Sequence, residues 1–162
     1  MKIAIASDHA GYQLKEDVKM WLRELGHEAR DFGTHSEDPV DYPDFAVLAA
    51  EAVSRGECDR GIVLGGSGNG EAIVANKIPG IRCALCHDVT TARLARAHND
   101  ANMLALGQRI VGTEVARDIV RSWLETPFDS GRHQQRIEKI SAIEARLIEN
   151  GRKAATGGSA RE

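Results

Sequence analysis

The stretch Gly61-Ile-Val-Leu-Gly-Gly-Ser-Gly-Asn-Gly-Glu-Ala-Ile-Val-Ala-Asn-Lys77 carries the pattern that decides the fold. A short apolar segment is followed by a loop with glycines at 65, 66, 68 and 70, and then by a helical segment. Glycine lets the backbone turn with positive φ and lets a ligand approach the main chain closely. The N–H groups at the start of the next helix attract anions. We therefore predict a strand, an anion-binding loop and a helix, with the carboxylate of Glu71 beside the loop.

Two familiar nucleotide-binding loops do not fit this stretch. A P-loop requires Lys and then Ser or Thr after its second glycine. Here Glu71 and Ala72 follow Gly70, and a carboxylate would repel a triphosphate. The dinucleotide-binding loop reads G-x-G-x-x-G after the first strand of its unit, whereas this loop reads G-x-G-x-G and follows the third predicted strand. A glycine-rich turn that binds no ligand is the remaining alternative.

Strand-like and helical segments alternate along the chain, and apolar residues recur at helical spacing between the strands, as at Leu14, Val18 and Trp21. This alternation predicts a Rossmann-like, three-layer α/β/α sandwich with a five-stranded parallel sheet. The predicted strands are Lys2–Ser7, Glu28–Phe32, Arg60–Leu64, Arg82–Cys86 and Met103–Leu106.

The last apolar pattern, in Arg132–Glu149, predicts a long helix with no strand after it. Its apolar stripe indicates that this C-terminal helix packs on another subunit and serves in dimerisation. We expect residues 1–150 to form a single domain and residues 151–162, which are small, polar and rich in glycine, to be a disordered tail. The apolar stripe consists of Ile137, Ile140, Ile143, Leu147 and Ile148.

Composition excludes several classes of protein. The 162 residues fit one ordinary domain. A formal net charge of −3 gives no electrostatic footprint for nucleic acid, and no apolar run approaches the length of a membrane span. The N-terminus resembles a strand rather than a signal peptide, and three cysteines cannot form a disulfide framework. We therefore expect a cytoplasmic protein that binds neither nucleic acid nor membranes.

The segment Cys83-Ala-Leu-Cys86-His87 matches the C-x-x-C-H pattern of haem attachment. Haem is attached covalently outside the cytoplasm, where we do not expect this chain. The segment also fits a buried strand in which cysteine acts as a small hydrophobe, and we prefer this interpretation. A redox dithiol is the alternative.

Polar residues cluster where the predicted strands end. In an open parallel sheet, ligands bind beyond the carboxyl ends of the strands, so we expect several of these residues to meet at one edge. They are Asp8 and His9 after the first strand, Ser67 and Glu71 after the third, His87 and Asp88 after the fourth, and His98-Asn99-Asp100 and Gly107-Gln108-Arg109 before and after the fifth.

Simpler explanations exist for some of these residues. Asp8 could cap the first helix, and His98-Asn99-Asp100 could be a turn that ends a helix. A metal site from Asp8, His9, His87 and His98 is conceivable, but no close ligand spacing supports it. We therefore expect no metal.

Arg132 and Arg136 lie four residues apart at the start of the last helix, where like charges destabilise a helix. Arginine suits bidentate phosphate binding, so a bound anion would relieve the repulsion, although a solvated basic turn is the alternative. Arg109 could supply another cation. Together with a carboxylate base, loop N–H groups and histidines, these residues match proton abstraction next to the carbonyl of a phosphorylated substrate.

At this point the chain resembles the type B ribose-5-phosphate isomerases, a family that also includes allose- and galactose-6-phosphate isomerases. The resemblance covers about nine-tenths of the chain and excludes only the C-terminal tail. It is carried by Asp8-His9-Ala10-Gly11, Gly65–Gly70 with Ala75-Asn76-Lys77, Arg93–Asn102, and Gly131-Arg-His-Gln-Gln-Arg136.

The resemblance implies a metal-independent, cofactor-free aldose–ketose isomerase that forms a homodimer or a dimer of dimers, with active sites at the subunit interface. By resemblance, Asp8 and His98 would help to open the furanose ring, and His133 would assist. The phosphate would be bound by His9, Arg109, Arg132 and Arg136, the last two from the neighbouring subunit. The N–H groups from Gly66 through Gly68, Asn69 and Gly70 would hold the enediolate oxygen beside Ser67, and Tyr42 and Asn99 would line the pocket.

One departure from the family pattern decides the base. Many members have a cysteine where this chain has Gly65, and a second branch has a glutamate at the position of Glu71, so the chain resembles the glutamate branch. Glu71 would then transfer a proton between C2 and C1 through a cis-enediolate and interconvert ribose 5-phosphate and ribulose 5-phosphate in the pentose phosphate pathway. A helix N-terminus lowers the pKa of a carboxylate and weakens it as a base, whereas burial acts in the opposite direction.

Two other functions remain open: isomerisation of a hexose 6-phosphate such as allose or galactose 6-phosphate, and sugar-phosphate binding by a regulator without catalysis. Catalysis would be lost in Glu71→Gln, whereas a regulator needs no base. The presence of Glu71, His98 and His133 therefore argues against the regulator.

Overall fold

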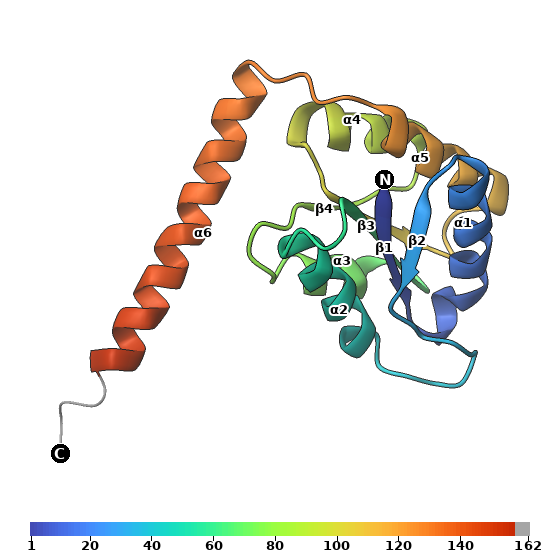
Figure 1. The fold of residues 1–162 in the computed structure, drawn as a ribbon, viewed down its shortest axis with the longest axis horizontal. Coiled ribbons are helices and arrows are strands. Elements are labelled where there is room, and N and C mark those ends of the chain that lie inside the picture. Colours follow the sequence, from blue (N-terminus) through green and yellow to red (C-terminus); the bar gives the residue numbers. More distant parts are fainter. Residues whose placement is uncertain (158–162) are drawn as a thin grey trace. The chain divides into compact units, whose positions relative to one another are not determined.

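The computed structural model describes residues 1–157 and divides the chain into two units, Met1–Phe128 and Asp129–Glu162. In the first unit, strands and helices alternate as the sequence predicts, and a short 3₁₀ helix, η1, follows the first strand (Figure 1). The elements are β1 (Lys2–Ser7), η1 (His9–Gly11), α1 (Tyr12–Glu24), β2 (Glu28–Asp31), α2 (Tyr42–Ser54), β3 (Arg60–Gly65), α3 (Asn69–Ala75), β4 (Cys83–Leu85), α4 (Val89–Asn99), β5 (Met103–Gly107) and α5 (Thr113–Glu125).

The five strands form one sheet in the order β2-β1-β3-β5-β4, and every neighbouring pair is parallel. Ile5 is opposite Ile62, and Gly61 is opposite Met103, so the three central strands are nearly in step. The predicted five-stranded parallel sheet is confirmed, and only β4, at the edge, is clearly shorter than predicted.

Side chains alternate strictly between the two faces of the sheet. In β1, Ile3 and Ile5 enter one hydrophobic cluster, with residues of α1, α4 and α5, whereas Ala4 and Ala6 enter the other, with residues of α2 and α3. A strand covered on both faces must be apolar at successive positions, as β1 is. The predicted three-layer α/β/α arrangement is therefore confirmed (Figure 1).

The connections create a crevice at the carboxyl ends of β1 and β3. From β1 the chain continues into α1 on one face, and from β3 it continues into α3 on the other face. In open α/β sheets a ligand binds where neighbouring strands lead to opposite faces. The topology thus places the glycine-rich loop after β3 next to the segment that follows β1.

The second unit consists mainly of one long helix, α6 (Arg132–Gly157). It starts where the sequence predicts but continues past the expected end at 149, through part of the segment predicted to be a disordered tail. Residues 158–162 lie outside the described residues, so disorder of the tail stays a prediction. Along α6, Ile140, Ile143 and Leu147 are exposed. Within residues 1–157, no helix combines the length and the apolar character that a membrane crossing needs.

Candidate active site

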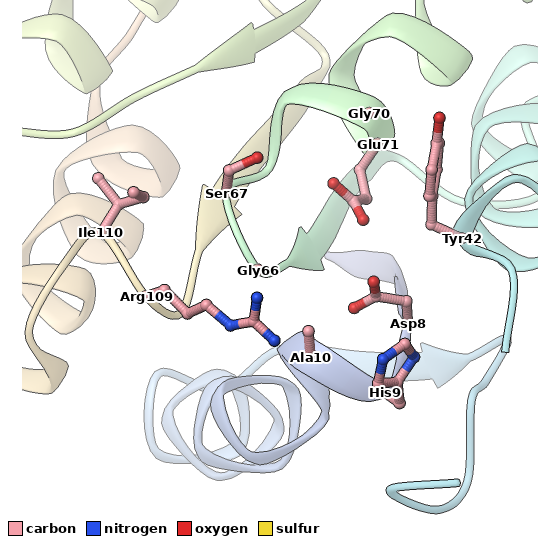
Figure 2. A pocket seen from close by; sticks show the side chains of 10 residues that line it. All are labelled: Asp8, His9, Ala10, Tyr42, Gly66, Ser67, Gly70, Glu71, Arg109 and Ile110. Atoms are coloured by element: carbon pink, nitrogen blue, oxygen red, sulfur yellow. The ribbon is translucent and has the colours of Figure 1, made fainter. Parts of the chain in front are cut away.

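A pocket of about 410 Å³ opens at the carboxyl edge of the sheet, beside the ends of β1, β3 and β5 (Figure 2). The segments that follow β1, β3 and β5 supply its walls, including the first turn of α3, together with the first residue of α2. The lining residues are Asp8, His9, Ala10, Tyr42, Gly66, Ser67, Gly70, Glu71, Arg109 and Ile110.

Glu71 lies in the first turn of α3, and its side chain turns back over the end of β3. Only 4% of the residue is exposed. A Cβ atom at Gly65 would lie 2.0 Å from Oε1 and 2.3 Å from the carboxyl carbon of Glu71. The carboxylate therefore occupies the space in which a side chain at position 65 would sit, and only glycine at 65 leaves room for it.

The electrostatic environment of Glu71 favours the role of a base. Burial raises the pKa of Glu71, and the negative charge of Asp8 acts in the same direction, while the hydrogen bond from the backbone N–H of Glu71 lowers it less. The net shift is upward. A carboxylate with a raised pKa binds a proton more strongly, which suits a general base that works near neutral pH.

Asp8 follows β1 and has two partners within the backbone. Its Oδ1 accepts a hydrogen bond from the N–H of Gly11 at 2.9 Å, so Asp8 caps η1. Its own N–H donates to the carbonyl of Leu64 at 3.2 Å, which joins it to the end of β3. Asp8 is 9% exposed and faces the same pocket as Glu71 (Figure 2). The capping role and a role in the pocket therefore coexist.

The end of the pocket near Ala10 carries groups that can bind an anion. The guanidinium of Arg109 reaches toward Gly66 and Ala10, and a Cβ at Gly66 would lie 3.4 Å from its central carbon (Figure 2). The ring of His9 lies near the backbone of Val40, with Nδ1 at 3.3 Å from both the nitrogen and the oxygen. A cationic side chain and an imidazole at one end suit a phosphate.

The glycine-rich loop is held in place by its neighbours. The N–H groups of Gln108 and Arg109 donate to the carbonyls of Gly65 and Gly66 at 2.9 and 3.0 Å, so the loop after β5 fixes the loop after β3. Ser67 Oγ accepts from the N–H and the side-chain amide of Asn69 at 3.3 and 3.1 Å. Ser67 lines the pocket, whereas Gly68 and Asn69 lie outside its lining.

Tyr42 closes the pocket on the side of α3. It is the first residue of α2, and a Cβ at Gly70 would lie 2.7 Å from its ring. The ring therefore packs directly against the backbone of Gly70. This close approach requires glycine at position 70.

His98 and Asn99 lie at the opposite edge of the sheet from the pocket, so they do not meet Asp8 and Glu71 within one chain. They end α4, which starts at the carboxyl edge after β4 and returns to the amino edge before β5. The carbonyl of Asn99 accepts a hydrogen bond at 3.0 Å from Nε of Arg82, the residue just before β4. This contact places Asn99 at the amino end of β4. The C-terminal residue of this turn, Asp100, has φ 43° and caps α4.

The same geometry bears on the other predicted residues. Asp8 and His9 lie at the carboxyl edge and His98 at the amino edge, so the four residues of the conceivable metal site are not brought together. Arg132, His133 and Arg136 belong to the second unit, where they occupy the first two turns of α6.

The C-x-x-C pair is part of the packed interior. Cys86 belongs to the core cluster beneath α1, α4 and α5, and Cys83 packs against the cluster on the other face. Burial raises the pKa of Cys83 to about 12 and that of Cys86 to about 11. Both thiols are therefore protonated at neutral pH, which agrees with the core-packing interpretation and makes them poor nucleophiles.

Two pocket residues were missed from the sequence, Ala10 and Ile110. Each directly follows a residue that was recognised, His9 and Arg109. An apolar residue next to a charged one at the carboxyl end of a strand gives no chemical signal, so only the position could have indicated them.

Comparison with known proteins gives one consistent result. A family model described as Ribose/Galactose Isomerase matches residues 3–140. The curated Ribose-5-phosphate isomerase B of Escherichia coli (strain K12) is 48% identical over 145 residues, which is 90% of this chain and 97% of that protein.

Solved structures agree with this similarity. The solved structure of Clostridium thermocellum Ribose-5-Phosphate Isomerase B matches this chain with a TM-score of 0.89 and 54% identity. The match covers 91% of this chain and 99% of that chain. Ribose-5-phosphate Isomerase B from Mycoplasma genitalium with bound Ribulose-5-phosphate has a TM-score of 0.85 and 40% identity, covering 89% of this chain and 96% of that chain. The chain therefore belongs to the ribose/galactose isomerase family.

Proposed function

We propose that this protein is an aldose–ketose isomerase that interconverts ribose 5-phosphate and ribulose 5-phosphate, with Glu71 as the base. The observation that carries the proposal is the position of the Glu71 carboxylate, which is almost fully buried and fills the space above Gly65 in a pocket that also holds Asp8, His9 and Arg109. Relatives that carry the name ribose-5-phosphate isomerase B support the choice of sugar.

The chemical step follows from this arrangement. Glu71 removes the proton from C2 of the open-chain aldose, the electrons of the C–H bond form the C1–C2 double bond, and the negative charge passes to O1. Backbone N–H groups of the loop, with the Ser67 hydroxyl, stabilise that charge. The O2 proton then passes to O1, Glu71 returns its proton to C1, and a carbonyl forms at C2. The proton that leaves C2 thus returns at C1, and no oxidant or reductant is consumed.

The other residues bind and prepare the substrate. Asp8 exchanges a proton with the sugar hydroxyls during ring opening, and His9 and Arg109 bind the phosphate at the Ala10 end of the pocket. Tyr42 bounds the sugar on the α3 side. Ring opening is needed because the furanose form of ribose 5-phosphate has no free carbonyl.

His98 and Asn99 act only if a second copy supplies them. His98 and Asn99 lie at the amino edge of the sheet, far from the pocket of their own chain, so their part in ring opening and substrate binding requires a homodimer. Arg132, His133 and Arg136 would reach the phosphate and the sugar of a neighbouring subunit in the same way. The exposed residues Ile140, Ile143 and Leu147 on α6 supply an apolar face for that association.

Turnover of a pentose phosphate compared with that of hexose phosphates tests the proposal. With EDTA present, the purified protein should convert ribose 5-phosphate to ribulose 5-phosphate with a higher kcat/KM than it shows for allose 6-phosphate or galactose 6-phosphate. Equal or better turnover of a hexose 6-phosphate would replace the assigned substrate. Thermal stabilisation by ribose 5-phosphate without any turnover would instead identify a binding protein that lacks catalysis.

A further inference from the structure

Lys15 is a charged residue in the interior of the first unit, away from the pocket lining. It lies on α1, and its side chain is 0% exposed. Its Nζ lies 2.7 Å from Oδ2 of Asp31 at the end of β2 and 3.0 Å from Oε1 of Glu16. Lysine is almost never fully buried unless it is paired. A buried ion pair also contributes little to stability relative to apolar residues of similar size, so stability alone does not account for Lys15.

The partner of Lys15 connects it to the active site. While Oδ2 of Asp31 faces Lys15, Oδ1 accepts a hydrogen bond from the N–H of Gly33 at 2.9 Å. Burial by itself would raise the pKa of Asp31, but hydrogen bonds from Lys15, Lys19 and Gly33 outweigh it and lower the pKa, so Asp31 is ionised at neutral pH. A single carboxylate thus bridges α1 and the turn that follows β2.

That turn forms hydrogen bonds with both backbone polar groups of Ser7, the residue before Asp8. The N–H of Ser7 donates to the carbonyl of Gly33 at 2.7 Å, and the N–H of Thr34 donates to the carbonyl of Ser7 at 2.9 Å. On its other side, Asp8 is bonded through its N–H to Leu64 at the end of β3. The position of Asp8 relative to Glu71 is therefore set between β3 and the turn anchored by Asp31.

The turn has little freedom of its own. Gly33 has φ +98°, and a Cβ there would lie 2.6 Å from the ring of Phe45. The segment after it runs to Val40, whose backbone contacts the His9 ring at 3.3 Å, and then to Tyr42 at the start of α2. The stretch from residue 33 to residue 41 therefore borders three residues of the pocket, Asp8, His9 and Tyr42. Asp31 fixes the start of that stretch.

We propose that the Lys15–Asp31 pair, in which the lysine is fully buried, is a positioning device that holds Asp8 and His9 in register with Glu71. Lys15 is a positioning residue: it acts through Asp31 and Gly33 on Ser7 and Asp8, and it does not touch the substrate. The inference rests on the proposed function only for its kinetic consequence, since the structural link is independent of the reaction.

Two variants separate positioning from stability. Lys15→Met leaves the Asp31 carboxylate, whose side chain is 17% exposed, with Lys19 as its cationic partner. The double variant Lys15→Met/Asp31→Leu removes both charges and replaces them with apolar side chains, which restores or preserves folding stability, but it also removes the acceptor for the Gly33 N–H. Lys19→Met is the matched control. Lys19 contacts the same Oδ2 of Asp31 at 2.6 Å, and its side chain is 20% exposed. Its replacement leaves the contact between Lys15 and Asp31 in place.

The kinetic readout compares two reactions of each variant. We expect kcat/KM for ribose 5-phosphate to fall on the order of 10²-fold in the double variant, because a misplacement of about 1 Å costs that much, while Lys19→Met stays close to wild type. Exchange of the C1 proton of ribulose 5-phosphate with solvent deuterium needs Glu71 but no ring opening, so it should fall much less. A purely structural role would reduce both reactions by the same factor.

A crystal structure of the double variant gives a readout that does not depend on activity. A shift of Ser7 and Asp8 away from Glu71, with β3 and Glu71 unchanged, is the expected result. An Asp8 that stays in place, or wild-type kinetics in a folded double variant, would overturn the inference. A displaced Asp8 in a protein whose wild type shows no isomerisation would overturn the proposed function and leave the positioning role intact.

Discussion

Gly65 and Glu71 share one space at the end of β3: a Cβ on Gly65 would lie 2.0 Å from Oε1 of Glu71. A side chain at 65 and a carboxylate from 71 therefore exclude each other, because both would occupy the same point in the pocket. This relationship gives a physical reason why a chain with a glutamate base at 71 has no cysteine at 65. It also makes position 65 a direct probe of Glu71.

Gly65→Ala should reduce activity without unfolding the protein. The new methyl group displaces the Glu71 carboxylate, so kcat/KM for ribose 5-phosphate should fall by roughly 10²- to 10⁴-fold, the usual contribution of a positioned base. Gly112→Ala is the matched control, because nothing lies within 4 Å of a Cβ there. Kinetics and circular dichroism of both variants check the prediction, and an active Gly65→Ala protein would argue against Glu71 as the base.

The raised pKa of Glu71 predicts how stability depends on pH. Ionisation of Glu71 costs stability in the folded state because its folded pKa lies above the ordinary value of 4.5. The cost is absent below that value, builds up as pH rises to the folded pKa, and is constant above it. Glu71→Gln should therefore have a higher Tm than wild type at pH 8, and the difference should shrink as pH falls toward 4.5. A lower Tm for the variant at pH 8 would contradict the direction of the shift.

A shared active site predicts complementation between two inactive variants. In the proposed homodimer, Glu71→Gln and His98→Ala should each inactivate every site of their own dimer. When the two chains are mixed and reassembled, half of the dimers are mixed, and each of these has one intact site. Activity should recover to about a quarter of wild type in a symmetric dimer. No recovery after verified exchange of subunits would show that His98 does not act on the neighbouring chain.

The ring of Tyr42 should matter more than its hydroxyl. The ring packs on the backbone of Gly70 and bounds the pocket, so Tyr42→Ala should raise KM about tenfold, equivalent to about 1.4 kcal/mol of lost binding. Tyr42→Phe keeps the ring and should change KM little. If steady-state kinetics show equal losses in the two variants, the hydroxyl carries the interaction instead.

Most of the fold could be predicted because its signals are local. Apolar strands alternate with amphipathic helices, and β1 and β5 start and end within one residue of the predicted limits. The end of α6 could not be predicted in this way, since Gly151 lowers helix propensity without stopping the helix, and Ala154 and Ala155 beyond it favour a helix.

The candidate site was predicted only in part. Short motifs in the sequence reveal which residues belong to it, but their arrangement in space depends on contacts between distant parts of the chain. The loop, Glu71, Asp8 and Arg109 all lie at carboxyl ends of strands, where the topology rule places them. His98, by contrast, comes just before β5 and lies at the amino edge, outside the region in which the topology rule places a ligand. Lys15 left one unused signal: with Val18 and Leu22 it has helical spacing on the buried face of α1, and a charge at such a position requires a buried partner.

The most direct test of the central claim is conversion of ribose 5-phosphate to ribulose 5-phosphate in EDTA by wild type and by Glu71→Gln, followed by NMR in D₂O. Wild type should form ribulose 5-phosphate and exchange protons with solvent, while Glu71→Gln, folded and able to bind the sugar phosphate, should do neither at a comparable rate. Undiminished turnover and exchange in Glu71→Gln would contradict the assignment of the base and the mechanism built on it.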